Sequence, residues 1–194
     1  RPLVELSFWL DNLLWGMEPR AMHLESILLH CANSLLVFVL ARKLSDAGNN
    51  DGLLPLLAGL LFALHPVHVE AVAWIAGRTD LLLALFVLSS CCFLLRWLEV
   101  PRWQDLAAAL VLFGAALLSK ETALAFGAVS VVLVTTYPAT ATVRQRICAV
   151  GLLALPLLGI MLYALVLQRG TSGLSRFLTG GNVQLWHGGQ AGGR

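Results

Sequence analysis

The residues best suited to chemistry gather in one stretch, HPVHVEAVAWIAGRTD, at positions 65–80. It holds two histidines, two carboxylates and a guanidinium, which are His65, His68, Glu70, Asp80 and Arg78. Such a set could bind the phosphate and hydroxyls of a sugar phosphate, cap helix ends, or hold a metal. We favour the first interpretation, because His68 and Glu70 would point about 200° apart on a helix. A divalent metal is the least favoured alternative, and we predict no metal ligands.

A further cation, Lys120, stands between two apolar segments in the motif LLSKETA. Lysine presents a compact positive charge, which suits a phosphate that needs no bidentate partner. The neighbouring carboxylate of Glu121 could pair with Arg78 or with Lys120 itself. The alternative is a lysine that only extends its charge to the lipid–water interface.

Two more histidines, His23 and His30, lie about two helical turns apart and would share one helix face. His23 is predicted near the outer surface, where it could join the binding site. His30 lies deeper and close to Asn33. There the favoured interpretation is a buried His–Asn contact between helices.

The composition indicates a polytopic α-helical membrane protein. The 194 residues are 58% hydrophobic and 12% charged, with a mean hydropathy of +0.80, whereas soluble domains are about 25% charged. Several apolar runs approach the roughly 20 residues that cross about 30 Å of hydrocarbon. Phosphate-binding loops, dinucleotide loops and the GxSxG motif are absent, as are basic aromatic patches. ATPases, hydrolases and nucleic-acid partners are therefore disfavoured.

The hydropathy pattern predicts about six membrane spans. They are residues 22–41, 53–64, 80–98, the two halves of 105–137, and 147–168. The segment 105–137 is divided at Ser119-Lys120-Glu121, because a single long helix would carry a charged pair at mid-bilayer. Residues 1–21 are predicted to be an outer-surface loop with an interfacial helix over 6–17, and 22–168 a transmembrane domain. Residues 169–194 form a Gly-rich tail without helical periodicity.

Paired cations orient the spans. The pairs are Arg42 and Lys43, Arg96 and Arg102, and Arg144 and Arg146. With six spans all three pairs fall on one side, which the positive-inside rule makes cytoplasmic. The histidines and mixed charges described above then share the opposite, non-cytoplasmic face. Ionisable groups at membrane depth are costly, so we take these residues as candidates for a functional site.

Pro66 divides the polar stretch from the second span, because proline breaks a helix interior but suits the first helical position. The second span is predicted to end near Leu64. A short outer-surface helix is predicted from Pro66 to about Ile75, ended by Gly77. Asp80 could serve as the N-cap of the third span.

The order of these motifs resembles a known family. The motifs follow one another in the order RPL, H-x6-H with a nearby Asn, ALHPVHVEAVAWIAGRTDLL and LLSKETA. This order resembles the membrane domain of the transmembrane and tetratricopeptide-repeat (TPR) proteins and their bacterial relatives. The resemblance covers roughly residues 1–170, and it implies that the chain is a piece of a longer protein.

The resemblance implies a GT-C class glycosyltransferase, built as an all-α membrane helix bundle with short outer-surface helices. Such enzymes transfer a sugar, mannose in the animal members, from a polyprenyl- or dolichyl-phosphate carrier to protein Ser/Thr on the non-cytoplasmic face. The implied partners are membrane lipids, the lipid-linked sugar and a protein acceptor, with no cofactor beyond the donor. The catalytic acid is expected in an outer loop that would precede Arg1. The expected location is a bacterial inner membrane, or the endoplasmic reticulum membrane in a eukaryote.

Within that resemblance, eight residues are expected to bind the lipid phosphate and its sugar: His65, His68, Glu70, Arg78, Asp80, Lys120, Glu121 and His23. Lys120 and Arg78 would hold the phosphate, the histidines would orient phosphate or sugar, and the carboxylates Glu70 and Asp80 would hold the cations. The alternatives are a non-catalytic membrane anchor of a repeat protein and a transporter.

Overall fold

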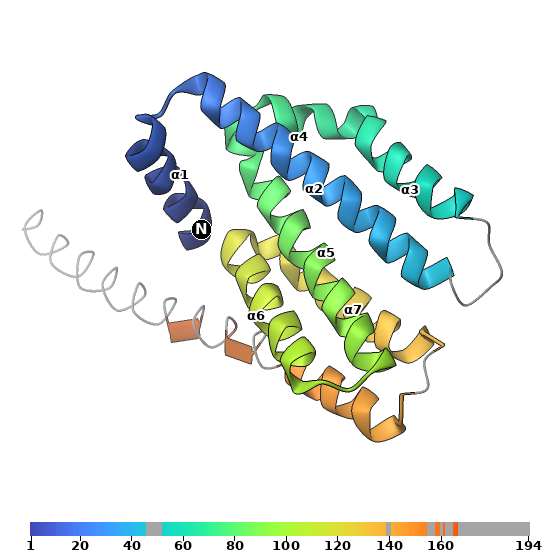
Figure 1. The fold of residues 1–194 in the computed structure, drawn as a ribbon. Coiled ribbons are helices and arrows are strands. Elements are labelled where there is room, and N and C mark those ends of the chain that lie inside the picture. Colours follow the sequence, from blue (N-terminus) through green and yellow to red (C-terminus); the bar gives the residue numbers. More distant parts are fainter. Residues whose placement is uncertain (46–51, 139–140, 155–157, 160, 162–164, 167–194) are drawn as a thin grey trace, which may run out of the picture. The chain divides into compact units, whose positions relative to one another are not determined.

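The computed structural model describes residues 1–45, 52–138, 141–154, 158–159, 161 and 165–166 (Figure 1). The chain divides into two units, Arg1–Pro156 and Leu157–Arg194, and the first of them holds every labelled helix. Of the second unit only a few helical residues are described, and the predicted tail 169–194 lies outside the described residues. The described residues form helices and turns without a strand. The predicted all-α membrane helix bundle is confirmed.

The first unit contains seven labelled α-helices and three short 3-10 turns. The α-helices are α1 Pro2–Trp15, α2 Pro19–Ser45, α3 Leu53–Leu64, α4 Val69–Ala73, α5 Arg78–Glu99, α6 Trp103–Ser119 and α7 Leu124–Thr136. The 3-10 turns are Pro66–His68, Ile75–Gly77 and Glu121–Ala123, and residues 143–154 are also helical. Helix α5 lies at the centre, with α6 and α2 packed along it and α3 packed on α2 (Figure 1).

Two described helices are long and apolar enough to cross a membrane, namely Pro19–Ser45 and Ile75–Glu99. Leu53–Leu64 and Pro66–Ala73 are bent by 45° and make a third if they count as one span. Trp103–Ser119 and Glu121–Thr136 are apolar but shorter. They occupy the places predicted for the fourth and fifth spans. The predicted sixth span, 147–168, lies partly outside the described residues.

The helices end where the sequence predicted, at residues 119–121 and at Pro66. Helix α6 ends at Ser119, and α7 follows after a single 3-10 turn. Helix α3 ends at Leu64, with His65 as an extended C-cap residue. The single outer helix predicted from Pro66 to about Ile75 is instead a 3-10 turn followed by the five-residue α4.

Contacts at one end of the bundle join the segments that carry the predicted cation pairs. Lys43 of α2 donates to both carboxylate oxygens of Glu99 on α5, at 2.8 and 3.0 Å. The phenol of Tyr137, which follows α7, donates to the same carboxylate at 2.8 Å. Arg146 donates to the backbone oxygen of Tyr137 at 2.9 Å. These contacts gather the ends of α2, α5 and α7 and the start of the segment 143–154 at one end of the bundle. The side of the membrane that this end faces stays a prediction.

The predicted interfacial helix is α1, which begins at Pro2 and ends at Trp15, before Gly16 in the left-handed region at φ 63°. Its apolar side chains at Leu6, Trp9 and Leu13 are exposed, whereas Asp11 on another face is buried. An exposed apolar face on a helix beside a membrane bundle is what an interfacial helix requires. Its placement at the lipid surface stays a prediction.

Candidate functional site

The polar side chains at the other end of the bundle surround a pocket of about 480 Å³. The ionisable residues that line it are Arg1, His68, Glu70, Asp80 and Lys120. They come from the N-terminus, the turn before α4, α4 itself, the first turn of α5 and the residue after α6. The pocket thus brings together four of the eight residues expected from the sequence.

Lys120 lines this pocket and pairs with Asp80. The two side chains are partly exposed, so a ligand can reach the ammonium group. Lys120 is the extended C-cap residue of α6, which directs its side chain away from the helix and toward the start of α5. Asp80 is therefore a partner of Lys120, as expected. The predicted N-cap role of Asp80 is wrong, because the N-cap residue of α5 is Gly77 and Asp80 lies in the first turn of the helix.

Glu121 pairs with neither of the cations that the sequence offered. Its carboxylate accepts from the guanidinium of Arg1 at 3.3 Å, and both side chains are largely exposed. The backbone N–H of Glu121 and then the Arg1 cation lower the pKa of this carboxyl. The reason for the different pairing is that Glu121 sits in the 3-10 turn after Lys120, on the side that faces the start of α1.

Arg78 is buried and does not line the pocket. Its side chain is 2% exposed and pairs with the carboxylate of Asp11 on α1. It also donates to Glu25 on α2 at 2.8 Å. The guanidinium carbon lies 5.0 Å from the ring centroid of Phe8, within the range of a cation–π contact. Arg78 thus joins α1, α2 and α5, and this geometry favours a positioning role over direct contact with a phosphate.

Glu25 strengthens the same junction from a second side. Its other carboxylate oxygen accepts from the indole N–H of Trp15 at 3.0 Å. The buried cation therefore has two carboxylate partners, which satisfies the requirement that a buried charge be paired. Asp11 and Glu25 were not among the expected site residues. Their only signal in the sequence is an acid within an otherwise apolar helical pattern.

Glu70 lines the pocket from α4 and has no ion pair or side-chain hydrogen bond within the described part of the chain. It therefore does not hold a cation, contrary to its expected role. His68 precedes it and lines this pocket and a second cavity as well. A carboxylate and an imidazole without strong partners can form hydrogen bonds with the hydroxyls of a ligand.

Close packing shapes the segment between Pro66 and α5. The ring nitrogen Nδ1 of His65 accepts from the backbone N–H of Val67 at 3.2 Å, which caps the 3-10 turn. At Gly77 a Cβ atom would lie 2.6 Å from the backbone oxygen of Ala71. Gly77 was predicted to end the outer helix, but α4 already ends at Ala73 and Gly77 has φ −66°. Glycine is needed here for space, and not for a left-handed backbone.

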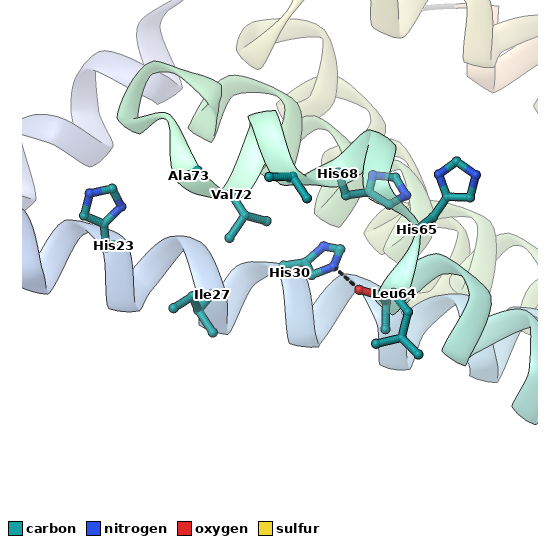
Figure 2. Close-up of a pocket in the computed structure, with 10 residues that line it drawn as sticks. His23, Ile27, His30, Leu64, His65, His68, Val72 and Ala73 are labelled. Carbon is teal, nitrogen blue, oxygen red and sulfur yellow. Dashed lines mark hydrogen bonds between the residues drawn. The ribbon is translucent and has the colours of Figure 1, made fainter.

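The second cavity, of about 460 Å³, lies on the other side of α4 and is lined by four histidines (Figure 2). His23 and His30 line it from α2, with His65 and His68 across from them. The Nε2 of His30 bonds to the backbone oxygen of Ala63 at 3.1 Å, and its ring centroid lies 5.4 Å from that of His68. His30, which the sequence offered only as a packing residue, thus borders a cavity.

The predicted His30–Asn33 contact is not formed. Asn33 is fully buried and donates to the backbone oxygen of Leu81 on α5 at 3.0 Å, whereas His30 bonds to α3. Each side chain therefore joins α2 to a different neighbouring helix. Positions 30 and 33 are only about 60° apart around the helix, so the contact is missing because a backbone oxygen of a neighbouring helix engages each side chain.

None of the described histidine, cysteine, aspartate and glutamate side chains form a group of three or more that could hold a metal ion. In the polar pocket, Asp80 is engaged by Lys120. The pocket offers the cation of Lys120, the carboxylate of Glu70 and the imidazole of His68, which are groups able to hydrogen-bond to charged or hydroxyl-bearing molecules.

The family of dolichyl-phosphate-mannose-protein mannosyltransferases matches residues 2–165 of the chain. The protein O-mannosyl-transferase Tmtc1 of Drosophila melanogaster is 44% identical over 131 residues, which are 64% of this chain and 14% of that protein. The human protein O-mannosyl-transferase TMTC2 is 43% identical over 95 residues, 48% of this chain and 11% of that protein. The human protein O-mannosyl-transferase TMTC3 is 32% identical over 130 residues, 62% of this chain and 13% of that protein. No solved structure matches the chain.

Proposed function

We propose that this chain, which belongs to the family of dolichyl-phosphate-mannose-protein mannosyltransferases, forms the donor-holding part of a membrane enzyme that transfers mannose to protein Ser/Thr hydroxyls. The donor is a polyprenyl- or dolichyl-phosphate sugar, and transfer takes place on the non-cytoplasmic face. The chain covers 14% of the length of its fruit-fly relative, so the rest of the enzyme would supply the acceptor site. The observation that carries the proposal is the polar pocket around Lys120.

Lys120 is the group proposed to contact the carrier phosphate. It lines the pocket, and its partner Asp80 lines the same pocket. Arg1 adds a second cation to the same lining. A bound phosphate would compete with Asp80 for the ammonium group, and charge-assisted hydrogen bonds of this kind are the strong ones.

Glu70 and His68 are proposed to receive the sugar. Both line the pocket, and neither makes an ion pair within the described residues. A carboxylate accepts from sugar hydroxyls, and an imidazole can donate or accept. Trp74 lines the same pocket and offers an aromatic face against which a sugar ring could lie.

The proposed transfer breaks the bond between the anomeric carbon and the carrier phosphate oxygen, and forms one to the acceptor hydroxyl oxygen. The hydroxyl proton passes to a carboxylate acting as general base. The leaving phosphate gains negative charge, which the Lys120 cation stabilises more in the transition state than in the bound donor. The general base is assigned to the part of the enzyme that precedes Arg1, in keeping with the family resemblance.

The role that we propose for Arg78 differs from the phosphate contact expected from the sequence. Because its guanidinium is buried between Asp11 and Glu25, we assign it the task of holding the start of α5. Asp80 lies two residues further along that helix. Arg78 thereby sets the position of the carboxylate that directs Lys120, and it is a positioning residue.

The proposal is tested by replacing Lys120 with alanine and measuring the binding of a short-chain prenyl-phosphate mannose to the intact protein in lipid nanodiscs. We expect about 10- to 100-fold weaker binding, because a hydrogen bond to a charged group contributes about 1.5–3 kcal/mol. Lys43→Ala is the matched control. Lys43 is also paired with a carboxylate and has a similar side-chain exposure, 23% against 24% for Lys120, but it lies at the other end of the bundle.

Unchanged donor binding in a folded Lys120→Ala protein would contradict the phosphate assignment. Equal losses in the Lys120 and Lys43 variants would also contradict it, since they would indicate a general electrostatic effect. If the intact protein binds no lipid-linked sugar at all, a non-catalytic membrane anchor becomes the better description.

A further inference from the structure

A third cavity, of about 460 Å³, lies at the end of the bundle that carries the paired cations. It is lined by the end of α5, the start of α6 and the start of the helical segment 143–154. Trp97, Trp103, Arg144 and Gln145 belong to its lining. The cavity shares no residue with the polar pocket or with the histidine-lined cavity, so it is a separate site.

Arg144 gives this cavity a positive charge that no carboxylate in the described part of the chain neutralises. Two acids near this end are engaged by other cations. Glu99 pairs with Lys43 at 2.8 Å, and Asp105 pairs with Arg96 at 3.5 Å. The Arg144 side chain is exposed, and a guanidinium binds phosphate through a planar fork of donors. The charge of the cavity therefore favours an anionic ligand.

The first turn of the segment 143–154 borders the same cavity. The backbone N–H of Thr142 donates to Oε1 of Gln145 at 2.6 Å, and the backbone N–H of Gln145 donates to Oγ1 of Thr142 at 3.3 Å. This reciprocal pair caps the helix and holds both residues in the cavity lining. The amide nitrogen of Gln145 has no partner among the described residues. The positive end of the helix dipole adds to the attraction of an anion.

Trp97 adds a buried donor that lacks an acceptor. Its side chain is 3% exposed, and its indole N–H has no hydrogen-bond partner within the described part of the chain. Buried N–H groups are nearly always paired, so an acceptor bound in the cavity would satisfy it. The ring of Trp103 packs against that of Trp97, with 5.0 Å between the ring centroids. Tryptophans are typical of the lipid–water interface.

We propose that this cavity binds the phosphate of an anionic phospholipid head group. The guanidinium of Arg144 pairs with the phosphate, and the indole N–H of Trp97 and the amide of Gln145 are further donors. Anionic lipids are concentrated in the cytoplasmic leaflet, and basic pockets between membrane helices on that side bind their head groups. The paired cations predict that this end of the bundle faces the cytoplasm. The assignment is independent of the proposed donor site at the other end.

A free phosphate ion offers the same charge and the same acceptors as the head group. The lining favours the lipid, because Pro101, Cys148 and the two indole rings give the cavity an apolar surface beside its cation. A hydrated ion gains nothing from such a surface, whereas the glycerol and first methylene groups of a lipid do. The test must still separate the two sources.

The test uses native mass spectrometry of the intact protein, released from micelles that contain phosphatidylglycerol or phosphatidylcholine. Both lipids carry a phosphodiester, but the choline cation makes the second lipid neutral overall. We expect the protein to retain one phosphatidylglycerol in preference to phosphatidylcholine. An excess of inorganic phosphate should not displace it.

Variants locate the bound lipid. Arg144→Ala should weaken the retention of phosphatidylglycerol about 10- to 100-fold, as expected for the loss of a hydrogen bond to a charged group. Arg144→Lys should recover part of it, since the charge remains but the fork is lost. Arg102→Ala is the matched control, because Arg102 is an exposed arginine at the same end but outside the lining. Trp97→Phe keeps an aromatic ring without the N–H and should weaken retention about 2- to 10-fold.

Four results would overturn the proposal. They are equal retention of the two lipids, unchanged retention in a folded Arg144→Ala protein, equal losses in the Arg144→Ala and Arg102→Ala proteins, and displacement by inorganic phosphate. Equal losses would indicate a general attraction to the basic end, and displacement would indicate a site for a free anion. None of these results bears on the polar pocket, which the Lys120→Ala protein tests with the lipid-linked sugar.

Discussion

Arg78 and Glu25 lie 53 residues apart in the sequence, yet the guanidinium donates to the carboxylate at 2.8 Å. The same guanidinium pairs with Asp11 and is 2% exposed. One buried cation therefore joins the N-terminal helix, the first long span and the start of the central span. The polar pocket shares α5 with this junction, since α5 begins at Arg78 and carries Asp80 in its first turn.

Replacing Arg78 with alanine should destabilise the whole first unit. Removing one partner of a buried ion pair leaves an uncompensated charge and costs about 3–5 kcal/mol. We expect a clearly lower midpoint of thermal unfolding for the purified protein in nanodiscs, with or without donor. Arg102→Ala, at an exposed arginine, should change the stability by less than about 0.5 kcal/mol. A stable Arg78→Ala protein that has lost only donor binding would instead indicate that Arg78 contacts the phosphate.

Gly77→Ala should disturb the turn between α4 and α5. The added Cβ would lie 2.6 Å from the backbone oxygen of Ala71, and relieving such overpacking costs about 1–3 kcal/mol. Gly114→Ala is the control, because nothing lies within 4 Å of its added Cβ and alanine favours a helix over glycine by about 1 kcal/mol. Thermal unfolding of both variants measures the difference. A stabilising effect at Gly77 would mean that the close approach to Ala71 is wrong.

Asn33→Ala should weaken the packing of α2 against α5. The side chain donates to the backbone oxygen of Leu81 at 3.0 Å, and hydrogen bonds between membrane helices contribute about 0.6 kcal/mol on average and up to about 1.7. Ser34→Ala should have almost no effect, because Ser34 bonds to the oxygen of His30 within its own helix. Denaturation in mixed micelles compares the two free energies of unfolding, and equal values would argue against the interhelical bond.

Cysteine labelling should reveal which end of the bundle faces the cytoplasm. In a protein whose four cysteines are replaced by alanine, Glu121→Cys should react with a membrane-impermeant maleimide from the non-cytoplasmic side. Arg102→Cys should react only after permeabilisation, because it lies at the end with the paired cations. The Arg1–Glu121 pair is exposed, so its loss should cost little. Labelling of both cysteines from one side would contradict the proposed orientation.

The family resemblance and the helix positions were predictable from local features. Pro66 ends α3, and Ser119 ends α6 beside a charged pair, because proline geometry and the cost of charge in hydrocarbon act within a few residues. The site was only partly predictable. The sequence predicted that Lys120 and Asp80 lie on one face of the membrane, and the structure shows that they form an ion pair.

The sequence by itself determined where the chain is helical, where it breaks, and which charges share an end of the bundle. Those outcomes depend on hydropathy, proline and charge within one or two helical turns. Only the tertiary structure decided that Arg78 pairs with Asp11 and Glu25, and that α4 separates the polar pocket from the histidine-lined cavity. Partners 53 and 67 residues away are chosen by how the helices pack, and a buried cation takes whichever carboxylates that packing brings within reach.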